Sequence, residues 1–220
     1  AGREAPSLAG GCSTAPPAAF HNAYYALRHG ISEANEQGLI VSRPENGVPG
    51  YGLSSKGWAA TAQALRRGQL PAGLDPANTV VYTSDFKRAV DTARVLCEAA
   101  GLAAAAVDAR LRERSFGTLE LQATSNYERV WAIDASGQAP SEFEAESTES
   151  VRARLCQLLR ELEGVHRGKV VVLTSHGDTL QILQTIFAGI PSHQHRSLPH
   201  LENAELRRMQ AGVGPGLQGD

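Results

Sequence analysis

Two histidines and two arginines stand where they could handle a phosphoryl group. Arg28-His29-Gly30 and Ser175-His176-Gly177-Asp178 each follow a short apolar run, and Arg88 comes soon after a third run that ends in Ser84-Asp85. Arginine offers a rigid fork of donors that matches phosphate oxygens and keeps its charge at working pH. A neutral histidine can attack phosphorus through a ring nitrogen. If the fold brings these side chains together, they predict phosphoryl transfer.

Three apolar runs, each expected to form a strand, would position these residues. They cover residues 23–27, 79–83 and 170–174, and nearly unbroken runs of this kind are typical of strands covered on both faces of a parallel sheet. The carboxyl ends of such strands lie at one edge of the sheet, where ligands bind in folds of this kind. The two arginines and two histidines should therefore converge at that edge.

Helical patterns fill the intervals between the predicted strands. Apolar residues recur at helical spacing in four segments, which are residues 58–65, 86–100, 151–162 and 180–187. Gly101, Gly164 and Gly189 should end the last three helices, and Ser147 should cap the start of the third. Alternating strands and helices predict a three-layer α/β/α sandwich with a mostly parallel central sheet. We expect residues 203–209 to add an edge strand.

The predicted strand ends also suit an anion in their backbone. Helices that begin after residues 30, 84 and 177 would direct free N–H groups toward the same point. Gly30 and Gly177 leave no side chain where the backbone must pass close to a substrate. Backbone and side chains thus predict one phosphate-binding site.

Four segments carry motifs that occur in the same order in a known enzyme family. Residues 28–35 read RHGISEAN, and residues 84–93 read SDFKRAVDTA around Arg88. Residues 111–117 read LRERSFG and contain Glu113, and residues 175–178 read SHGD. Together these segments resemble the motifs of the histidine phosphatase superfamily, in its phosphoglycerate mutase-like branch. The resemblance spans about residues 22–210, and four motifs in order are far more specific than one.

The resemblance implies a role for each matching residue. His29 would be the nucleophile that becomes a transient phosphohistidine. Arg28, Arg88 and His176 would hold the phosphoryl oxygens and stabilise charge in the transition state. Glu113 would protonate the leaving oxygen and then activate the water that hydrolyses the phosphoenzyme. The implied activity is that of a metal-independent phosphatase without a cofactor, acting on a phosphomonoester.

Three further residues are candidates for substrate binding. Asn35 would contact the phosphate or orient the first loop, and Gly177 would let the substrate approach the backbone. Arg114, beside the acid, would grip the rest of an anionic substrate. Asp178 is expected to be a helix-start residue, because a related branch of the family carries its acid directly after the second histidine, whereas Gly177 intervenes here.

Two other functions remain as alternatives. A cofactor-dependent phosphoglycerate mutase uses the same core, but mutases of this family carry a longer insertion with basic residues after the acid motif. Between Gly117 and Glu146 this chain has only Arg129 as a basic residue, which favours a phosphatase. The alternative of a different class is a non-catalytic phosphate-binding or scaffold protein on the same fold. The complete set of catalytic residues argues against it.

The length of 220 residues favours one large domain. We expect residues 20–210 to form a single catalytic domain, with residues 114–150 as a lid-like excursion that is partly helical. Residues 1–19 are rich in Ala, Gly, Pro and Ser and are interpreted as a flexible arm or the remnant of a targeting segment. The glycine-rich residues 211–220 are expected to be a flexible tail.

Bulk composition narrows the partners. A net charge of -2 gives no overall attraction to nucleic acid or to an anionic membrane, and no apolar run approaches the roughly 18 residues that span a bilayer. A small phosphorylated molecule is the expected substrate, and a phosphoprotein also fits. The three cysteines, Cys12, Cys97 and Cys156, are odd in number and show no close pairing, and Cys97 and Cys156 are interpreted as buried free thiols in a reducing compartment. That compartment would be the cytoplasm, or the interior of an organelle if residues 1–19 are the remnant of a targeting segment.

The histidines near the C-terminus invite comparison with a metal site. His193 and His195 lie close to His200, but no acidic or cysteine partner is spaced to complete a ligand set of three or four. We therefore expect an exposed loop there and no metal.

Overall fold

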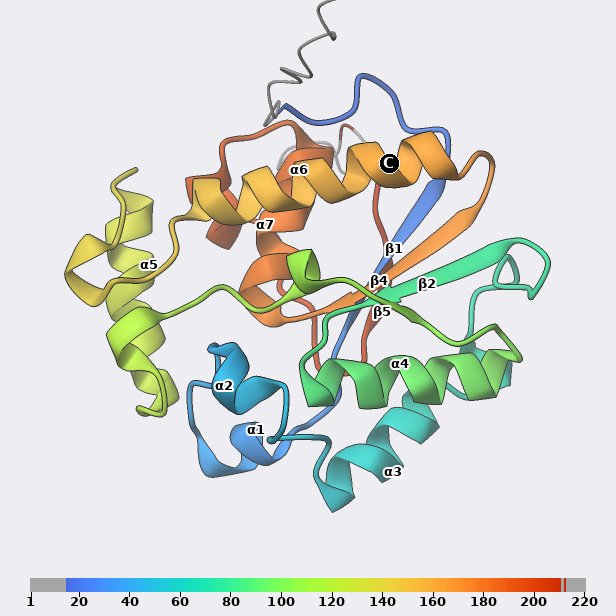
Figure 1. The fold of residues 1–220 in the computed structure, drawn as a ribbon, viewed down its shortest axis with the longest axis horizontal. Coiled ribbons are helices and arrows are strands. Elements are labelled where there is room, and N and C mark those ends of the chain that lie inside the picture. The colour runs from blue at the N-terminus through green and yellow to red at the C-terminus, as the bar shows by residue number, and fades with distance from the viewer. Residues whose placement is uncertain (1–14, 211, 213–220) are drawn as a thin grey trace, which may run out of the picture.

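The computed structural model describes residues 15–210 and 212. These residues form a central five-stranded sheet of order β3-β2-β4-β1-β5 between two layers of helices (Figure 1). The strands are β1 (Ala23–Arg28), β2 (Thr79–Thr83), β3 (Ala106–Val107), β4 (Val170–Ser175) and β5 (Leu206–Arg208). The pairs β1–β4, β2–β4 and β2–β3 are parallel, and β5 is antiparallel to β1. The predicted mostly parallel α/β sandwich is confirmed.

Strand β4 sets the register of the sheet. All six of its residues are buried, because β1 and β2 flank it and helices cover both of its faces. Leu27 of β1 and Thr83 of β2 both lie opposite Thr174 of β4. The segments that follow these three strands therefore leave the sheet side by side, as the sequence predicts. The short edge strand β3 was not predicted, since both of its residues are exposed.

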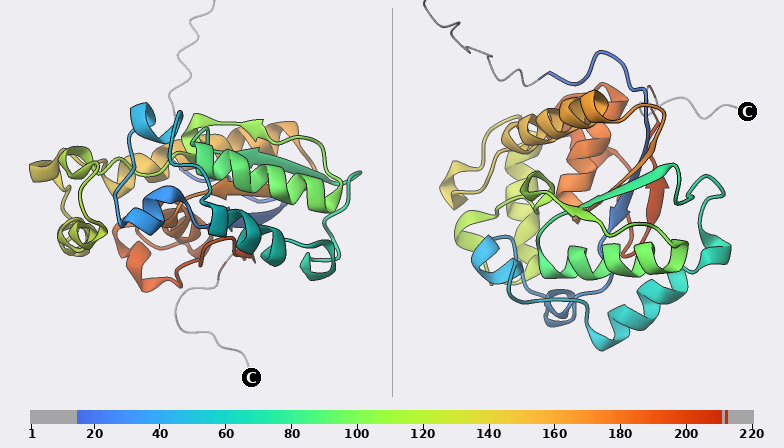
Figure 2. Two further views of the ribbon diagram at one scale, coloured as in Figure 1. Left: turned by 90° about the horizontal axis from the view of Figure 1, so that it is seen from below. Right: turned by 45° about the vertical axis from the view of Figure 1, so that its right-hand side comes forward.

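Two layers of helices enclose the sheet. Helices α6 and α7 cover one face, and α3 and α4 cover the other (Figure 2). Apolar residues of the strands alternate between these layers, so that Ala26 packs toward α6 and α7 while Leu27 packs toward α4. The α-helices are α1 (Glu33–Gln37), α2 (Pro44–Gly47), α3 (Ser55–Ala64), α4 (Lys87–Ala100), α5 (Tyr127–Ala135), α6 (Thr148–Val165) and α7 (Gly177–Ala188). The 3₁₀ helices are η1 (Arg67–Gln69), η2 (Ala109–Leu111), η3 (Gly117–Leu119), η4 (Thr124–Asn126), η5 (Ser141–Phe143) and η6 (Ser192–Ser197).

The helix ends test the predicted caps. Ser147 caps α6 by accepting a hydrogen bond from the backbone of Ser150, and Gly101 and Gly189 end α4 and α7 in the left-handed conformation, each with φ of 68°. The prediction that Gly164 ends the third helix was wrong, because α6 continues to Val165. A single glycine is tolerated inside a helix at a cost of about 1 kcal/mol, and Gly168 makes the left-handed turn instead.

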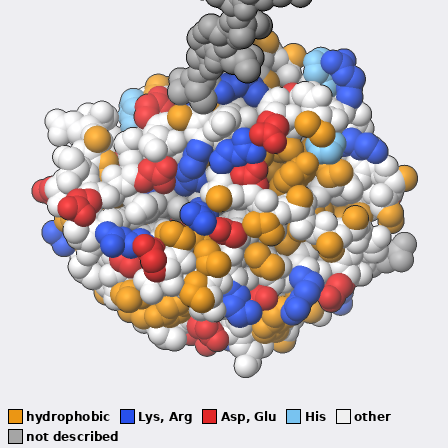
Figure 3. Space-filling model, viewed as in Figure 1, with side chains coloured by type: hydrophobic (Ala, Val, Ile, Leu, Met, Phe, Trp, Pro, Cys, Tyr) orange, Lys and Arg blue, Asp and Glu red, His pale blue; other side chains and the backbone are white. Residues whose placement is uncertain are grey.

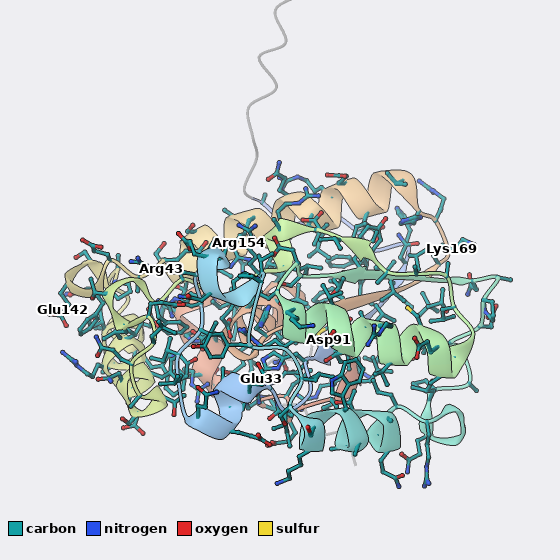
Figure 4. All side chains as sticks on the ribbon, turned by 60° about the horizontal axis from the view of Figure 1, so that its bottom comes forward. Glu33, Arg43, Asp91, Glu142, Arg154 and Lys169 are labelled. Atoms are coloured by element: carbon teal, nitrogen blue, oxygen red, sulfur yellow. The ribbon has the colours of Figure 1, made fainter. Side chains whose placement is uncertain are left out.

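Residues 114–150 leave the sandwich as an excursion that is partly helical. It contains η3, η4, α5 and η5, and it has a small core in which Phe116, Leu119, Val130 and Phe143 pack against Ile40. Figure 1 shows α5 beyond the carboxyl ends of the strands. Figure 4 shows Glu142 of η5 at the outer end of the excursion, far from the sheet. The excursion therefore stands beside the edge where the predicted site residues emerge.

The surface and the cysteines agree with the composition. Acidic and basic side chains are interspersed over the face in Figure 3, so neither sign of charge dominates it. Cys97 and Cys156 are buried free thiols, as predicted, whereas Cys12 and most of the two terminal segments, 1–19 and 211–220, lie outside the described residues. Within the described part of the chain, every helix is too short or too polar to cross a membrane.

Candidate active site

His29 lies directly after β1 and is almost fully buried. Its backbone N–H donates to Ser175 O at 3.0 Å, which continues the pairing with β4. Its Nδ1 lies 2.8 Å from Gly30 O, and because a carbonyl can only accept, Nδ1 carries the proton and Nε2 keeps its lone pair. Burial, together with the charges of Arg88 and Arg28, lowers the pKa of His29 well below its ordinary value. The ring is therefore neutral, and Nε2 keeps a lone pair that could attack phosphorus.

Gly30 is fixed by close packing rather than by an unusual backbone angle. A Cβ at this position would lie 1.9 Å from Thr61 Oγ1, so no other residue fits without rearrangement. The Gly30 N–H donates to Thr92 Oγ1 at 2.9 Å, and Thr92 in turn donates to Arg88 O at 2.7 Å. Asn203 Nδ2 donates to His29 O at 2.9 Å. Thr92 and Asn203 thus hold the nucleophile's backbone, a role that the sequence did not reveal.

Arg28, at the end of β1, reaches toward the segment before β5. Its Nη1 donates to His200 Nε2 at 2.7 Å and to Leu201 O at 2.8 Å. Its Nε is buried and has no partner among the described residues. Arg28 is thus anchored at one end of its guanidinium and retains a free donor at the other.

Arg88 comes from the first turn of α4 and is also buried. Its Nε donates to His29 Nε2 at 3.2 Å, and its Nη2 donates to Val41 O at 2.8 Å. Its Nη1 is buried without a partner in the described part of the chain. Arg88 therefore contacts the attacking nitrogen and has one donor to spare.

His176 caps the start of α7 and lies 5.1 Å from His29 between ring centroids. Ser84 Oγ accepts from the Phe86 N–H at 3.2 Å, so its own proton can go to His176 Nε2, which is 2.9 Å away. His176 Nδ1 then carries a proton, and it is buried without a partner among the described residues. Burial and the nearby Arg88 lower the pKa of His176 well below its ordinary value.

Glu113 supplies a buried carboxyl group next to these donors. Its Oε1 accepts from the Arg114 N–H at 3.0 Å and from the N–H and hydroxyl of Thr179 at 3.2 Å each. Within the described residues its hydrogen bonds all end on Oε1, which leaves Oε2 to carry a proton. Burial and the charge of Asp178 raise the pKa of Glu113, which suits a general acid.

A cavity of about 240 Å³ opens beside Glu113. Arg28, Asn35 and Gly177 line it together with residues that the sequence did not single out as site residues. Those additional lining residues are Phe116, Thr124, Tyr127, Trp131, Asp178 and His200. The excursion and the carboxyl edge of the sheet therefore enclose one space, which Arg28 and Glu113 border.

Asn35 and Gly177 both line this cavity. Asn35 Oδ1 accepts from the Ser32 N–H at 3.0 Å and from its hydroxyl at 2.9 Å, which forms the cap of α1. Helix α1 thus begins at Glu33, two residues later than predicted after Gly30. Its Glu33 N–H donates to Gly52 O at 3.0 Å, and its Asn35 N–H donates to Ser32 Oγ at 3.2 Å. A Cβ on Gly177 would approach His200 Cε1 to 3.2 Å. Asn35 also holds the first loop through its bonds to Ser32.

Arg114 is not placed to grip a substrate, which corrects the prediction for this residue. It is fully buried behind the cavity and absent from its lining. Its guanidinium donates to Asp134 at 2.6 and 2.8 Å, to Asp178 at 3.1 Å and to Glu146 O at 2.6 Å. With its donors occupied, Arg114 joins α5 to the start of α7. Asp178, predicted as a helix-start residue, stands in the first turn of α7 and is also an ion-pair partner.

The histidines near the C-terminus depart from the predicted exposed loop. His195 is fully buried within η6, and its Nε2 lies 3.7 Å from Asp178 Oδ1. His200 is exposed, as predicted, but it also lines the cavity and contacts Arg28. The polar residues around His195 hid its burial, because that burial comes from the contacts of η6 with α7 and α5. No group of three potential metal ligands occurs among the described residues.

Comparisons with known proteins agree with this arrangement. A model of the histidine phosphatase superfamily (branch 1) matches residues 24–214. A probable phosphoglycerate mutase of Klebsiella pneumoniae is 27% identical over 198 residues, which cover 88% of this chain and 86% of that protein. The mycobacterial glucosyl-3-phosphoglycerate phosphatase, solved with VO3, is 27% identical with a TM-score of 0.67, covering 85% of this chain and 90% of that one. The alpha-ribazole phosphatase of Shigella flexneri, at 19% identity and a TM-score of 0.64 over 84% of this chain and 89% of its own, shares the fold.

Proposed function

The chain belongs to branch 1 of the histidine phosphatase superfamily, and from that premise we propose that it is a metal-independent phosphatase. It hydrolyses a phosphomonoester through a phosphohistidine on His29. Residues 20–210 act as one catalytic domain, and residues 114–150 act as a lid over the substrate. A small phosphorylated molecule is the expected substrate.

One observation carries this proposal. Three buried nitrogens, Arg28 Nε, Arg88 Nη1 and His176 Nδ1, lack partners among the described residues. They belong to the residue before His29, to the arginine whose Nε lies 3.2 Å from His29 Nε2, and to a ring whose centroid lies 5.1 Å from that of His29. Leaving a buried donor unpaired costs about 1–3 kcal/mol, so a ligand that accepts from all three is expected. A phosphoryl group has three peripheral oxygens and a negative charge, which matches this set.

In the first step His29 Nε2 attacks phosphorus and the ester P–O bond breaks. The proton on Glu113 passes to the leaving oxygen, and the Nδ1–H bond to Gly30 O stabilises the positive charge that develops on the ring. In the second step Glu113, now ionised, takes a proton from water as the water attacks phosphorus. The N–P bond breaks, and inorganic phosphate leaves with His29 neutral again.

The mutase alternative finds less support. A mutase must keep water from the phosphoenzyme and hold a carboxylated substrate, for which basic residues in the excursion would be required. Arg129, the basic residue there, lies over the ring of Phe143 at 4.6 Å, donates to Asn126 Oδ1 at 3.2 Å and is absent from the lining of the cavity. A phosphatase needs neither property.

The decisive experiment measures phosphate release in the presence of a chelator, with His29→Ala as the control. The wild type should release phosphate from simple esters and form an acid-labile phosphoenzyme, because a phosphoramidate on imidazole hydrolyses in acid. Equal behaviour of wild type and His29→Ala would support the non-catalytic alternative. Efficient interconversion of phosphoglycerates with little phosphate release would support the mutase.

A further inference from the structure

The charged side chains that line the cavity limit which alcohol the phosphate ester of a substrate can contain. Arg28 is the one arginine or lysine among the residues that line the cavity, whereas Glu113 and Asp178 both contribute carboxyl groups. Burial and the adjacent Arg28 lower the pKa of His200, so this ring is neutral near neutral pH. An anionic group on the alcohol would therefore find no cation in the lining other than Arg28, whose unpaired donor is assigned to the phosphoryl group.

Three arginines that follow or approach the Glu113 segment, at positions 112, 114 and 154, are neutralised by ion pairs. Arg112 pairs with Asp85 at 2.5 Å, and Arg154 pairs with Glu146 at 3.0 Å. Arg114 pairs with Asp134 at 2.6 Å, as described above. Guanidinium groups held in this way are not available to a carboxylate or a second phosphate of a ligand.

The excursion provides an aromatic wall, which we define as Phe116, Tyr127 and Trp131. The rings of Phe116 and Tyr127 meet edge to face at 4.6 Å between centroids, and those of Tyr127 and Trp131 are stacked at 5.4 Å. All three residues line the cavity. Aromatic side chains offer a large apolar surface with few rotatable bonds, which suits them to binding a ring.

The wall is held rigidly. Trp131 Nε1 donates to Asp178 Oδ1 at 2.9 Å, and the guanidinium of Arg196 lies 3.8 Å from the centre of the indole ring. The indole N–H is thus satisfied within the protein. The Tyr127 hydroxyl makes no hydrogen bond to the described residues, and burial and Glu113 raise its pKa, so it remains a protonated donor beside the cavity.

We propose that the preferred substrates are small phosphomonoesters whose alcohol is uncharged and carries a single ring, and that the aromatic wall, through Tyr127, determines this preference. The inference rests on the proposed hydrolysis. The cavity of about 240 Å³ is smaller than the roughly 300 Å³ or more that drug-sized ligands occupy, which favours one ring over a nucleotide.

Three esters of primary alcohols test the preference with matched leaving groups. They are benzyl phosphate, which has a ring, glycerol 3-phosphate, which is neutral without a ring, and 3-phosphoglycerate, which carries a carboxylate. We expect kcat/KM to fall at least about tenfold from the first to the second, since apolar contacts in a pocket discriminate on this scale. It should fall further for 3-phosphoglycerate. A wild type that prefers 3-phosphoglycerate would overturn the inference.

Variants assign the preference to the wall. Tyr127→Ala should lower kcat/KM for benzyl phosphate about tenfold or more and leave that for glycerol 3-phosphate within about threefold. Ile133→Ala is the matched control, because Ile133 lies on α5 and packs in the core of the excursion away from the cavity. It should leave the ratio of the two substrates unchanged. Equal losses on both substrates in Tyr127→Ala would refute a role in specificity.

A failure of this inference can be told from a failure of the proposed function. Hydrolysis of glycerol 3-phosphate that depends on His29, without preference for the ring, would overturn only the inference. If none of the esters is hydrolysed, the proposed function fails. Calorimetric binding of benzylphosphonate against 3-phosphonopropionate then still tests the wall, and tighter binding of the carboxylated compound would refute it.

Discussion

Replacing Arg114 by methionine tests whether this residue is structural or binds substrate. The side chain has no exposed surface, and its two carboxylate partners, Asp134 and Asp178, are 1% and 5% exposed. Methionine fills a similar volume but leaves both carboxylates buried without their cation. The expected effect is on the stability of the fold, with α5 and the start of α7 losing their shared link.

The magnitude follows from the burial of the two acids. Removing one partner of a buried ion pair costs about 3–5 kcal/mol. For a chain of this size each kcal/mol lowers the melting temperature by about 2–4 °C, so Arg114→Met should melt about 6–20 °C below the wild type. The control Arg112→Met breaks a pair whose side chains are 35% and 20% exposed, and it should cost less than about 1 kcal/mol.

At acid pH the difference in the free energy of unfolding between Arg114→Met and the wild type should become smaller. Burial opposes ionisation of Asp178, but His195 and Arg114 outweigh it and hold the pKa of Asp178 below its usual range. The ionised Asp178 therefore stabilises the folded wild type. This contribution is fully present above the pKa that Asp178 has in the unfolded chain, and it is lost as the pH falls through its lower pKa in the folded protein. Without Arg114 the pKa of Asp178 in the folded protein rises. The free-energy penalty of burying the ionised Asp178 therefore shrinks as the pH falls toward the unfolded-chain pKa of about 3.9, and it disappears below that pH.

Urea denaturation at pH 7 and at pH 4.5, with kinetics at 20 °C, provides the assay. A structural role for Arg114 predicts a lower urea midpoint for Arg114→Met than for the wild type at pH 7, a smaller difference between the two at pH 4.5, and a nearly unchanged midpoint for Arg112→Met. An unchanged midpoint with a higher KM and the same kcat would refute it. In that case Arg114 would contact the substrate, as the sequence first suggested.

Three more predictions concern the site itself. Glu113→Gln should lower kcat about 10²–10⁴-fold on alkyl esters and much less on p-nitrophenyl phosphate, whose leaving group needs no proton. Because Glu113 must be protonated to act as the acid, the wild-type rate on alkyl esters should fall as the pH rises through its raised pKa. Gly30→Ala should abolish phosphate release, because its Cβ would lie 1.9 Å from Thr61 Oγ1. His200→Ala should raise KM about 5–10-fold through loss of the acceptor for Arg28.

Each of these predictions has its own control. Equal losses of Glu113→Gln on alkyl and p-nitrophenyl esters would mean that Glu113 does not donate the proton. Adding Thr61→Ala to Gly30→Ala should restore part of the activity, and no recovery would show that the clash is not the cause. His200→Gln keeps an acceptor for Arg28 and should retain a near-normal KM, with activity that no longer falls as His200 protonates in acid. A defect equal to that of His200→Ala would contradict this role.

The framework of the site was predictable because local sequence determines it. Continuous apolar runs gave β1, β2 and β4, and parallel pairing brought the residues after them together. Arg88 follows from this, since it stands in the first turn of the helix after β2. For these positions, knowledge of the strand ends was sufficient.

The remaining features depend on contacts between distant segments. Arg114 reads as a free cation until Asp134 and Asp178, 20 and 64 residues away, close around it. His195 stands in a polar string, yet it is buried beside Asp178. Tyr127 and Trp131 were visible as aromatic residues in the excursion, but only the packing of α5 against the sheet edge makes them a wall of the cavity.

The ion pairs of Arg114 with Asp134 and Asp178 also constrain how the substrate preference of such a protein can change in evolution. Arg114 and Asp134 belong to the excursion and Asp178 to the sandwich, so one guanidinium connects the excursion to the sandwich. Point changes in the aromatic wall leave this connection intact and can alter the preferred alcohol in small steps. Exchange of residues 114–150 by recombination removes Arg114 and Asp134 together, and only an incoming segment that brings a cation to Asp178 would fold stably. Gradual substitution is therefore the easier evolutionary route to a new substrate on this framework.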